Sequence, residues 1–186
     1  MNVALYSAVL APVVTIGSWF ISPRMWPSFD SVRLTISAMA ARGAPSRWVQ
    51  TSAFVVSGLC YLVTAIAVAA IGTPGRVLLA VGGATLIGAA LAPLPSPDGT
   101  SVAHSGVAGA HFLAMAMWPA AGMITVVGAP WLLTPLGAIL TSAFLLLLLL
   151  VFFVNLSRDT RVVGLTERIV AGAMTAWPLV LVLSLG

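Results

Sequence analysis

WLLTPLGAILTSAFLLLLLLVFFVN, residues 131–155, has no charged side chain from end to end. A helix needs about 20 mostly apolar residues to cross the hydrocarbon core of a bilayer, so this stretch predicts a membrane-spanning helix. Its middle, residues 144–153, is an almost unbroken block of bulky apolar side chains. Such a surface suits contact with acyl chains or with a partner subunit.

Five other apolar runs of similar length lie outward from this one along the chain. The predicted spans are residues 3–21, 48–72, 76–94, 104–127, 131–155 and 165–185. Turns rich in Gly and Pro, or polar connections, separate them at 72–75, 93–99, 128–130 and 157–164. Only 6% of the 186 residues are charged, whereas a soluble domain has about a quarter. We therefore predict an all-α integral membrane protein, a single transmembrane domain over 1–186 built as a six-transmembrane-helix bundle.

The placement of arginine predicts the orientation of this bundle. The first, third and fifth connections, with their helix ends, hold Arg24, Arg33, Arg42, Arg47, Arg158, Arg161 and Arg168. The other side holds only Arg76 of the eight basic residues. Because cytoplasmic loops carry the excess of Lys and Arg, these connections are predicted to be cytoplasmic and both termini outside. The basic charge is explained by orientation, so no nucleic-acid partner is expected.

The first connection carries a second helical pattern. Over residues 32–42, Val32, Ile36 and Met39 fall on one helical face, and Gly43 and Pro45 follow as stop signals. This pattern predicts a short interfacial helix in the first cytoplasmic connection. Two interpretations stay open: an amphipathic linker that rests on lipid headgroups, or a lid over a polar cavity.

The third predicted span has a repeat of small residues. Ala80, Ala84, Gly88 and Ala92 recur at every fourth position. Small residues let a neighbouring helix approach closely. We expect this face to be buried against protein, and we interpret Gly82 and Gly83 as packing residues.

The two histidines of the chain lie on one face of the fourth predicted span. His111 follows His104 by about two helical turns, along a stripe that includes Met115 and Trp118 and that we expect to face the bundle interior. His111 is either hydrogen-bonded to a neighbouring span or part of a proton or substrate path. About 10 Å separates the two rings along the axis, too far to share one metal ion or one haem. With Cys60 the one cysteine, and without nucleotide or CxxC motifs, no metal or cofactor is expected.

Our leading functional hypothesis is a protein that binds or translocates a lipid, or another amphiphile with an anionic headgroup. Arg33, Arg47 and Arg168 would contact the headgroup, and His111 would line the path of the apolar part. A different hypothesis is an accessory or scaffold subunit, which docks on a larger membrane complex or on a second copy through the fifth span.

A membrane-embedded enzyme acting on a lipid-soluble substrate is the remaining alternative. His111 or His104 would be the general base, and Asp98 or Glu167 the acid. A Ser-His-Asp hydrolase can be sketched from Ser101 or Ser96 with His104 and Asp98. That sketch is disfavoured, because neighbouring loop residues meet it by chance.

Four segments together resemble a known family. They are residues 33–48 (RLTISAMAARGAPSRW), 93–98 (PLPSPD), 109–111 (GAH) and 164–168 (GLTER). Their order and spacing resemble an uncharacterised bacterial membrane family, catalogued as domain of unknown function nine-nine-eight, over nearly the whole chain. The resemblance implies a six-helix inner-membrane protein without an assigned activity, distantly similar to the Frag1, DRAM and Sfk1 group.

The resemblance also implies a set of residues that matter to the family. The matching positions are Arg33, Ser37, Pro45, Arg47, Trp48, His111 and Arg168. Members carry an acidic residue before the serine and alanine run of the first connection. Asp30 is the nearest match here, and it lies slightly upstream.

Overall fold

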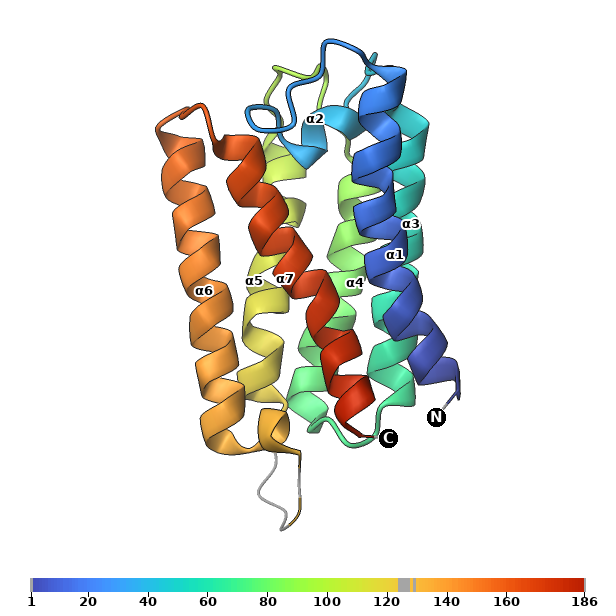
Figure 1. The fold of residues 1–186 in the computed structure, drawn as a ribbon, viewed down its shortest axis with the longest axis vertical. Helices are drawn as coiled ribbons and strands as arrows, with labels where there is room; N and C mark the ends of the chain where they lie inside the picture. The colour runs from blue at the N-terminus through green and yellow to red at the C-terminus, as the bar shows by residue number, and fades with distance from the viewer. Residues whose placement is uncertain (1, 124–127, 129, 186) are drawn as a thin grey trace.

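The computed structural model describes residues 2–123, 128 and 130–185, and Figure 1 shows its fold. The helices in chain order are α1 (Asn2–Met25), α2 (Ile36–Ala40), α3 (Arg47–Ala67), α4 (Thr73–Leu91), α5 (Val102–Ala121), the 3₁₀ turn η1 (Trp131–Leu133), α6 (Pro135–Ser157) and α7 (Val163–Ser184). The described residues contain no β-strand. The predicted all-α fold is confirmed.

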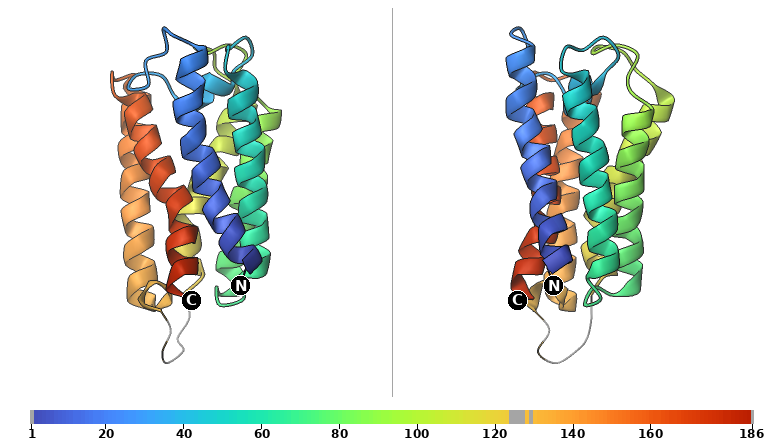
Figure 2. Two further views of the ribbon diagram at one scale, coloured as in Figure 1. Left: turned by 45° about the vertical axis from the view of Figure 1, so that its right-hand side comes forward. Right: turned by 90° about the vertical axis from the view of Figure 1, so that its right-hand side faces the viewer.

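Six long helices form a closed ring. Each packs on the next long helix along the chain, and α7 returns to pack on α1 (Figures 1 and 2). By length and composition, α1, α3, α4, α6 and α7 can each cross a membrane. Helix α5, which carries both histidines, is not in this set. Its 20 residues nevertheless extend about 30 Å, the thickness of the hydrocarbon core of a bilayer, and it lies between α4 and α6. The six-helix bundle of a multi-pass membrane protein is thus the fold of this chain.

The connections divide between the two ends of the ring. The α1–α3, α4–α5 and α6–α7 connections lie together at one end, and the two termini lie at the other (Figure 2). We call the first of these the arginine end, because it carries Arg24, Arg33, Arg42, Arg47, Arg158 and Arg161. The sequence pattern therefore corresponds to one physical end of the molecule.

Local chemistry explains where the helices stop. Helix α3 ends at Ala67, short of the predicted residue 72, and the Gly72 N–H donates to the carbonyl of Gly122 at the end of α5 (2.9 Å). Helix α4 has Pro74 in its first turn, where a backbone N–H would have no partner within the helix, so the missing N–H of proline costs no hydrogen bond.

The predicted fourth span ran to residue 127. Residues 124–127, and residue 129 of the predicted 128–130 turn, lie outside the described residues.

The short helix of the first connection is confirmed, but it is buried. It covers only Ile36–Ala40 instead of residues 32–42, and Ile36 and Met39 are 4% and 0% exposed. The Thr35 hydroxyl caps it by accepting the Ala38 N–H (3.1 Å). The Arg42 N–H donates to the Leu94 carbonyl (2.9 Å), which joins the first and third connections. Helix α2 thus closes the arginine end from within, as in the lid interpretation.

The small-residue face predicted on α4 is buried only in part. Ala84 of that repeat is exposed, and the buried face instead includes Gly82 and Gly83. A side-chain carbon added at Gly58 of α3 would lie 2.6 Å from the Gly83 carbonyl oxygen, so the two backbones touch there. The predicted packing role of Gly82 and Gly83 is confirmed. The close approach of α3 and α4 is possible because Gly58 and Gly83 have no side chains.

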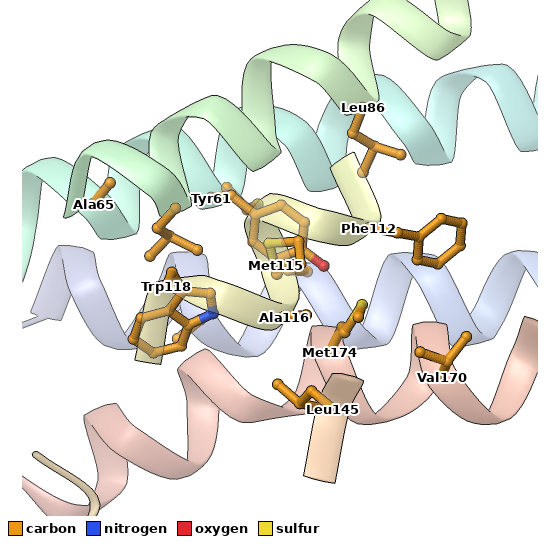
Figure 3. Packing of buried hydrophobic residues seen from close by; sticks show 14 of the residues in the cluster. Tyr61, Ala65, Leu86, Phe112, Met115, Ala116, Trp118, Leu145, Val170 and Met174 are labelled. Carbon is orange, nitrogen blue, oxygen red and sulfur yellow. The ribbon is translucent and has the colours of Figure 1, made fainter. Parts of the chain in front are cut away.

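The middle of the ring is filled by large side chains. Tyr61 of α3, Met115 and Trp118 of α5, Leu145 of α6 and Met174 of α7 meet in one cluster (Figure 3). Each of these five is 2% exposed or less. The predicted inward stripe of α5 is therefore confirmed, and the centre of the bundle is packed core.

Candidate functional site

A cavity of about 600 Å³ lies at the arginine end. Its wall combines α2 and the residues before it, the third connection, the arginine-end halves of α5 and α6, and the start of α7. The polar lining residues that carry the argument are Arg33, Ser37, Asp98, His104, Asp159 and Glu167. The apolar side is formed by Phe112, Phe152, Phe153 and Leu156. The cavity therefore has a charged rim and an aromatic wall.

His104 and Ser37 form a hydrogen-bonded pair in this cavity. His104 is 4% exposed, and its Nδ1 lies 2.9 Å from the Ala92 carbonyl oxygen. Because a carbonyl only accepts hydrogen bonds, Nδ1 carries the proton in the neutral ring. Nε2 then accepts from the Ser37 hydroxyl, 2.9 Å away. The pair joins α2 to the first turn of α5.

Glu167 is the buried carboxylate of the site. It is 4% exposed, and its Oε2 accepts the N–H of Ile36 at the start of α2. That bond connects residues 131 positions apart and comes from a backbone amide instead of an arginine. Because a polar group buried from water needs a hydrogen-bond partner, this contact helps to fix the position of α2 against α7.

A second, smaller cavity of about 50 Å³ lies next to the first. Ser37, Ala108, Phe112 and Glu167 line both spaces. His111 lines the smaller one only, and its Nδ1 donates to the Gly82 carbonyl of α4 (2.7 Å). The sequence interpretation of His111 as hydrogen-bonded to a neighbouring span is confirmed. A space of this size holds a few water molecules.

Arg168 contacts the first connection and lines neither cavity. Its Nη1 donates to the carbonyls of Ser31 (2.8 Å), Leu34 (2.9 Å) and Gly164 (2.9 Å). Its guanidinium also lies 5.5 Å from the ring centre of Phe29. Arg168 thus holds the chain before α2 against the start of α7.

The other two arginines assigned to a headgroup differ in position. Arg33 is exposed and lines the large cavity. Arg47 lies 4.6 Å from the ring centre of Trp48 at the start of α3 and lines neither cavity. Of the predicted ligand residues, the structure therefore brings only Arg33 to the large cavity and His111 to the small one.

The predicted acid and base candidates converge better than the arginines. Asp98, His104 and Glu167 all line the large cavity, although they come from the third connection, α5 and α7. Sequence reasoning missed the pairing of Ser37 with His104 and the lining role of Asp159. Only the family pattern had marked Ser37, and no spacing rule connects it with His104, because 67 positions separate the two residues.

Comparison with known families identifies the family that the four sequence segments resemble. The profile described as "Protein of unknown function (DUF998)" matches residues 9–184. The chain belongs to this family. The DUF998 match covers both cavities and every long helix except residues 2–8 of α1. The more distant similarity to the Frag1, DRAM and Sfk1 group stays a prediction. Searches of curated proteins and of solved structures found no match.

Proposed function

We propose that this DUF998 protein binds an amphiphile, with the headgroup in the large cavity at the arginine end. The observation that carries the proposal is the division of that cavity into a charged rim and an aromatic wall. Ligand sites are mostly apolar clefts of about 300–1,000 Å³ with a few polar groups that orient the ligand. A cavity of about 600 Å³ lies inside that range.

The aromatic wall reaches the outer surface of the ring. Phe153 and Leu156 of α6 line the cavity, yet they are 41% and 44% exposed. On the facing side, Ser105 of α5 lines the cavity and is also exposed. In a bilayer, an acyl chain could leave the cavity between these helices and remain in hydrocarbon, while its headgroup stays at the polar end.

The rim favours a headgroup that carries a phosphate together with hydrogen-bond donors. Arg33 supplies the positive charge for a phosphate. Asp98 and Asp159 are exposed acceptors on the same rim, which suit the amine or hydroxyl groups of a headgroup. The proposed headgroup thus keeps the anionic group predicted from the sequence and also carries hydrogen-bond donors. Binding alone is the core of this proposal, and translocation is its extension.

The setting that we propose is the bacterial inner membrane, with the arginine end in the cytoplasm and both termini outside. An impermeant maleimide added to intact cells tests it, because Cys60 is buried and gives little background. Arg42→Cys places a thiol at an exposed site of the arginine end, and Thr73→Cys places one at the opposite end. Labelling of Thr73→Cys alone is expected. Labelling of Arg42→Cys alone would reverse the orientation.

Two glycines of α5 provide a matched test of ligand binding. A side-chain carbon at Gly106 or at Gly109 would meet no atom within 4 Å, but only Gly109 lines the cavity. Gly109→Leu therefore adds a side chain to the cavity lining from an open position, and Gly106→Leu adds the same side chain outside the lining. Native mass spectrometry after mild detergent extraction should show lipid loss in Gly109→Leu and lipid retention in Gly106→Leu. Equal lipid retention in both variants would contradict the proposal.

An enzyme is the second candidate function, and the Ser37–His104 hydrogen bond is the observation that favours it. The scaffold hypothesis has no comparable support. The outer face of α6, with Leu147 and Leu150 more than half exposed, suits lipid as well as it suits a partner subunit.

A further inference from the structure

The Ser37–His104 pair has the arrangement of a nucleophile and its general base. Activated serines share a recognisable geometry: a hydroxyl that donates to a base, and a base oriented by a third group. Here the hydroxyl is that of Ser37, the base is Nε2 of His104 at 2.9 Å, and the orienting group is the Ala92 carbonyl at 2.9 Å. The carbonyl selects the tautomer whose Nε2 lone pair points to the serine.

Both members of the pair are held by independent contacts. Ser37 stands in the first turn of α2, between the Thr35 cap and the Glu167 carboxylate that binds the Ile36 N–H. His104 stands in the first turn of α5, where the Ser101 hydroxyl accepts its backbone N–H (3.2 Å). Such support reduces the freedom of both side chains, which a reacting pair requires.

The hydroxyl also lies where the reactive bond of an amphiphile would be. Ser37 lines the large cavity together with the charged rim residues and Phe112 of the aromatic wall, and it lines the smaller inner cavity as well. In an amphiphile, an ester that joins headgroup and acyl chain lies at the boundary between the polar and the apolar part. This part of the argument depends on the proposed function, because the ester must belong to an amphiphile bound in the cavity.

We propose that Ser37 is a nucleophile that accepts the acyl group of an ester-bearing amphiphile. The Ser37 oxygen forms a bond to the ester carbonyl carbon while its proton moves to Nε2 of His104. The bond from that carbon to the alcohol oxygen then breaks, and the proton leaves with the alcohol. Water, activated by the same nitrogen, releases the acid and restores the serine. The net reaction consumes one ester and one water and yields one acid and one alcohol.

The same geometry predicts slow turnover. In the Ser-His-Asp arrangement, a carboxylate stabilises the imidazolium that forms. A neutral carbonyl at Nδ1 orients the ring but stabilises its positive charge less. Arg33, the one permanent cation among the described residues that line the cavity, binds the headgroup phosphate in the proposed function, so no second guanidinium stabilises the negative charge that develops on the ester carbonyl oxygen.

A covalent probe tests the assignment without knowledge of the natural ester. The full-length protein, in mild detergent and in lipid nanodiscs, is incubated with a long-chain alkyl fluorophosphonate, and the modified peptide is mapped by mass spectrometry. We expect label on Ser37 in the wild type and none at this position in Ser37→Ala. His104→Gln should react about 100-fold more slowly, because general-base assistance contributes about 10²–10⁴-fold.

Ser157→Ala is the control, since Ser157 is an exposed serine at the arginine end of α6 that lines neither cavity. It should be labelled like the wild type. Monodispersity and melting temperature establish that each variant is folded. If His104→Gln does not fold, Ser37→Cys provides a second nucleophile at the same position. Loss of iodoacetamide reactivity at that cysteine on buffer exchange to an ester-bearing detergent would support occupancy beside position 37.

Absence of label on wild-type Ser37, or equal labelling rates in wild type and His104→Gln, would overturn the inference. Lipid retention is measured on the same samples. A protein that retains lipid but is not labelled refutes the nucleophile and leaves the proposed binding function intact. A protein that is labelled at Ser37 yet retains lipid equally in Gly109→Leu and Gly106→Leu refutes the binding site and supports the nucleophile.

Discussion

Replacement of Arg168 by methionine removes the contacts that hold the first connection against α7. Nη1 donates to the carbonyls of Ser31, Leu34 and Gly164, at 2.8 to 2.9 Å. Two hydrogens serve these three acceptors, and a hydrogen bond from a charged group contributes about 1.5–3 kcal/mol. Because the side chain is only partly buried, we expect a loss of about 2–4 kcal/mol. For a chain of this length, that lowers the melting temperature by roughly 5–15 °C.

The assay is thermal unfolding in detergent, followed by tryptophan fluorescence, together with limited proteolysis of residues 26–46. Arg168→Met should melt early and be cleaved faster, and Arg168→Lys should be intermediate, because one amine reaches fewer carbonyls. Arg161→Met is the control at an exposed position of the fifth connection, and a change within about 0.5 kcal/mol is expected. An Arg168→Met protein that melts like the wild type but loses bound lipid would refute this reasoning. It would instead favour the headgroup role inferred from the sequence.

Two further predictions concern packing and the headgroup. Gly58→Ala should destabilise the bundle by about 1–3 kcal/mol, because its new carbon would meet the backbone oxygen of Gly83; Gly17→Ala, with open space around it, should be neutral or stabilising by up to about 1 kcal/mol. Thermal unfolding decides, and equal stability of Gly58→Ala and the wild type would contradict the backbone contact. Arg33→Gln should lower retention of a phosphate-bearing lipid about ten-fold in native mass spectrometry. Arg24→Gln, at the same end but outside the cavity lining, should not, and equal losses would point to non-specific electrostatics.

The helices could be predicted from sequence because membrane spans are encoded in long local patterns. Apolar runs and turn residues placed all six, and the inward stripe of α5 followed from its two histidines with Met115 and Trp118. The buried face of α4 could not be chosen in the same way. Small residues lie on several of its faces, so the repeat through Ala84 looked as suitable as the glycine pair that packs. Only the position of α3 decides between them.

The candidate site was half predictable. Burial of His104 follows from its place on the inward stripe of α5, and the sequence named both His104 and Glu167 as candidates, but the burial of Glu167 was not predicted. The partner of His104 did not follow, because Ser37 reaches it only after the first connection folds into the end of the ring. The distribution of arginines did not predict the role of Arg168, for a related reason. It placed Arg168 at the correct end, but it could not show that the side chain turns to the carbonyls of its own chain.

Closure of the ring by α7 has a consequence for biogenesis. The ribosome makes Leu34 134 positions before the arginine that holds it. At about 5–20 residues per second, that interval lasts roughly 7–27 seconds. During it, α2 has neither the Glu167 carboxylate nor the Arg168 guanidinium to fix it, and the α1 surface that later meets α7 is open to lipid. Nascent chains arrested before α7 should therefore expose the connection between α1 and α3 to protease.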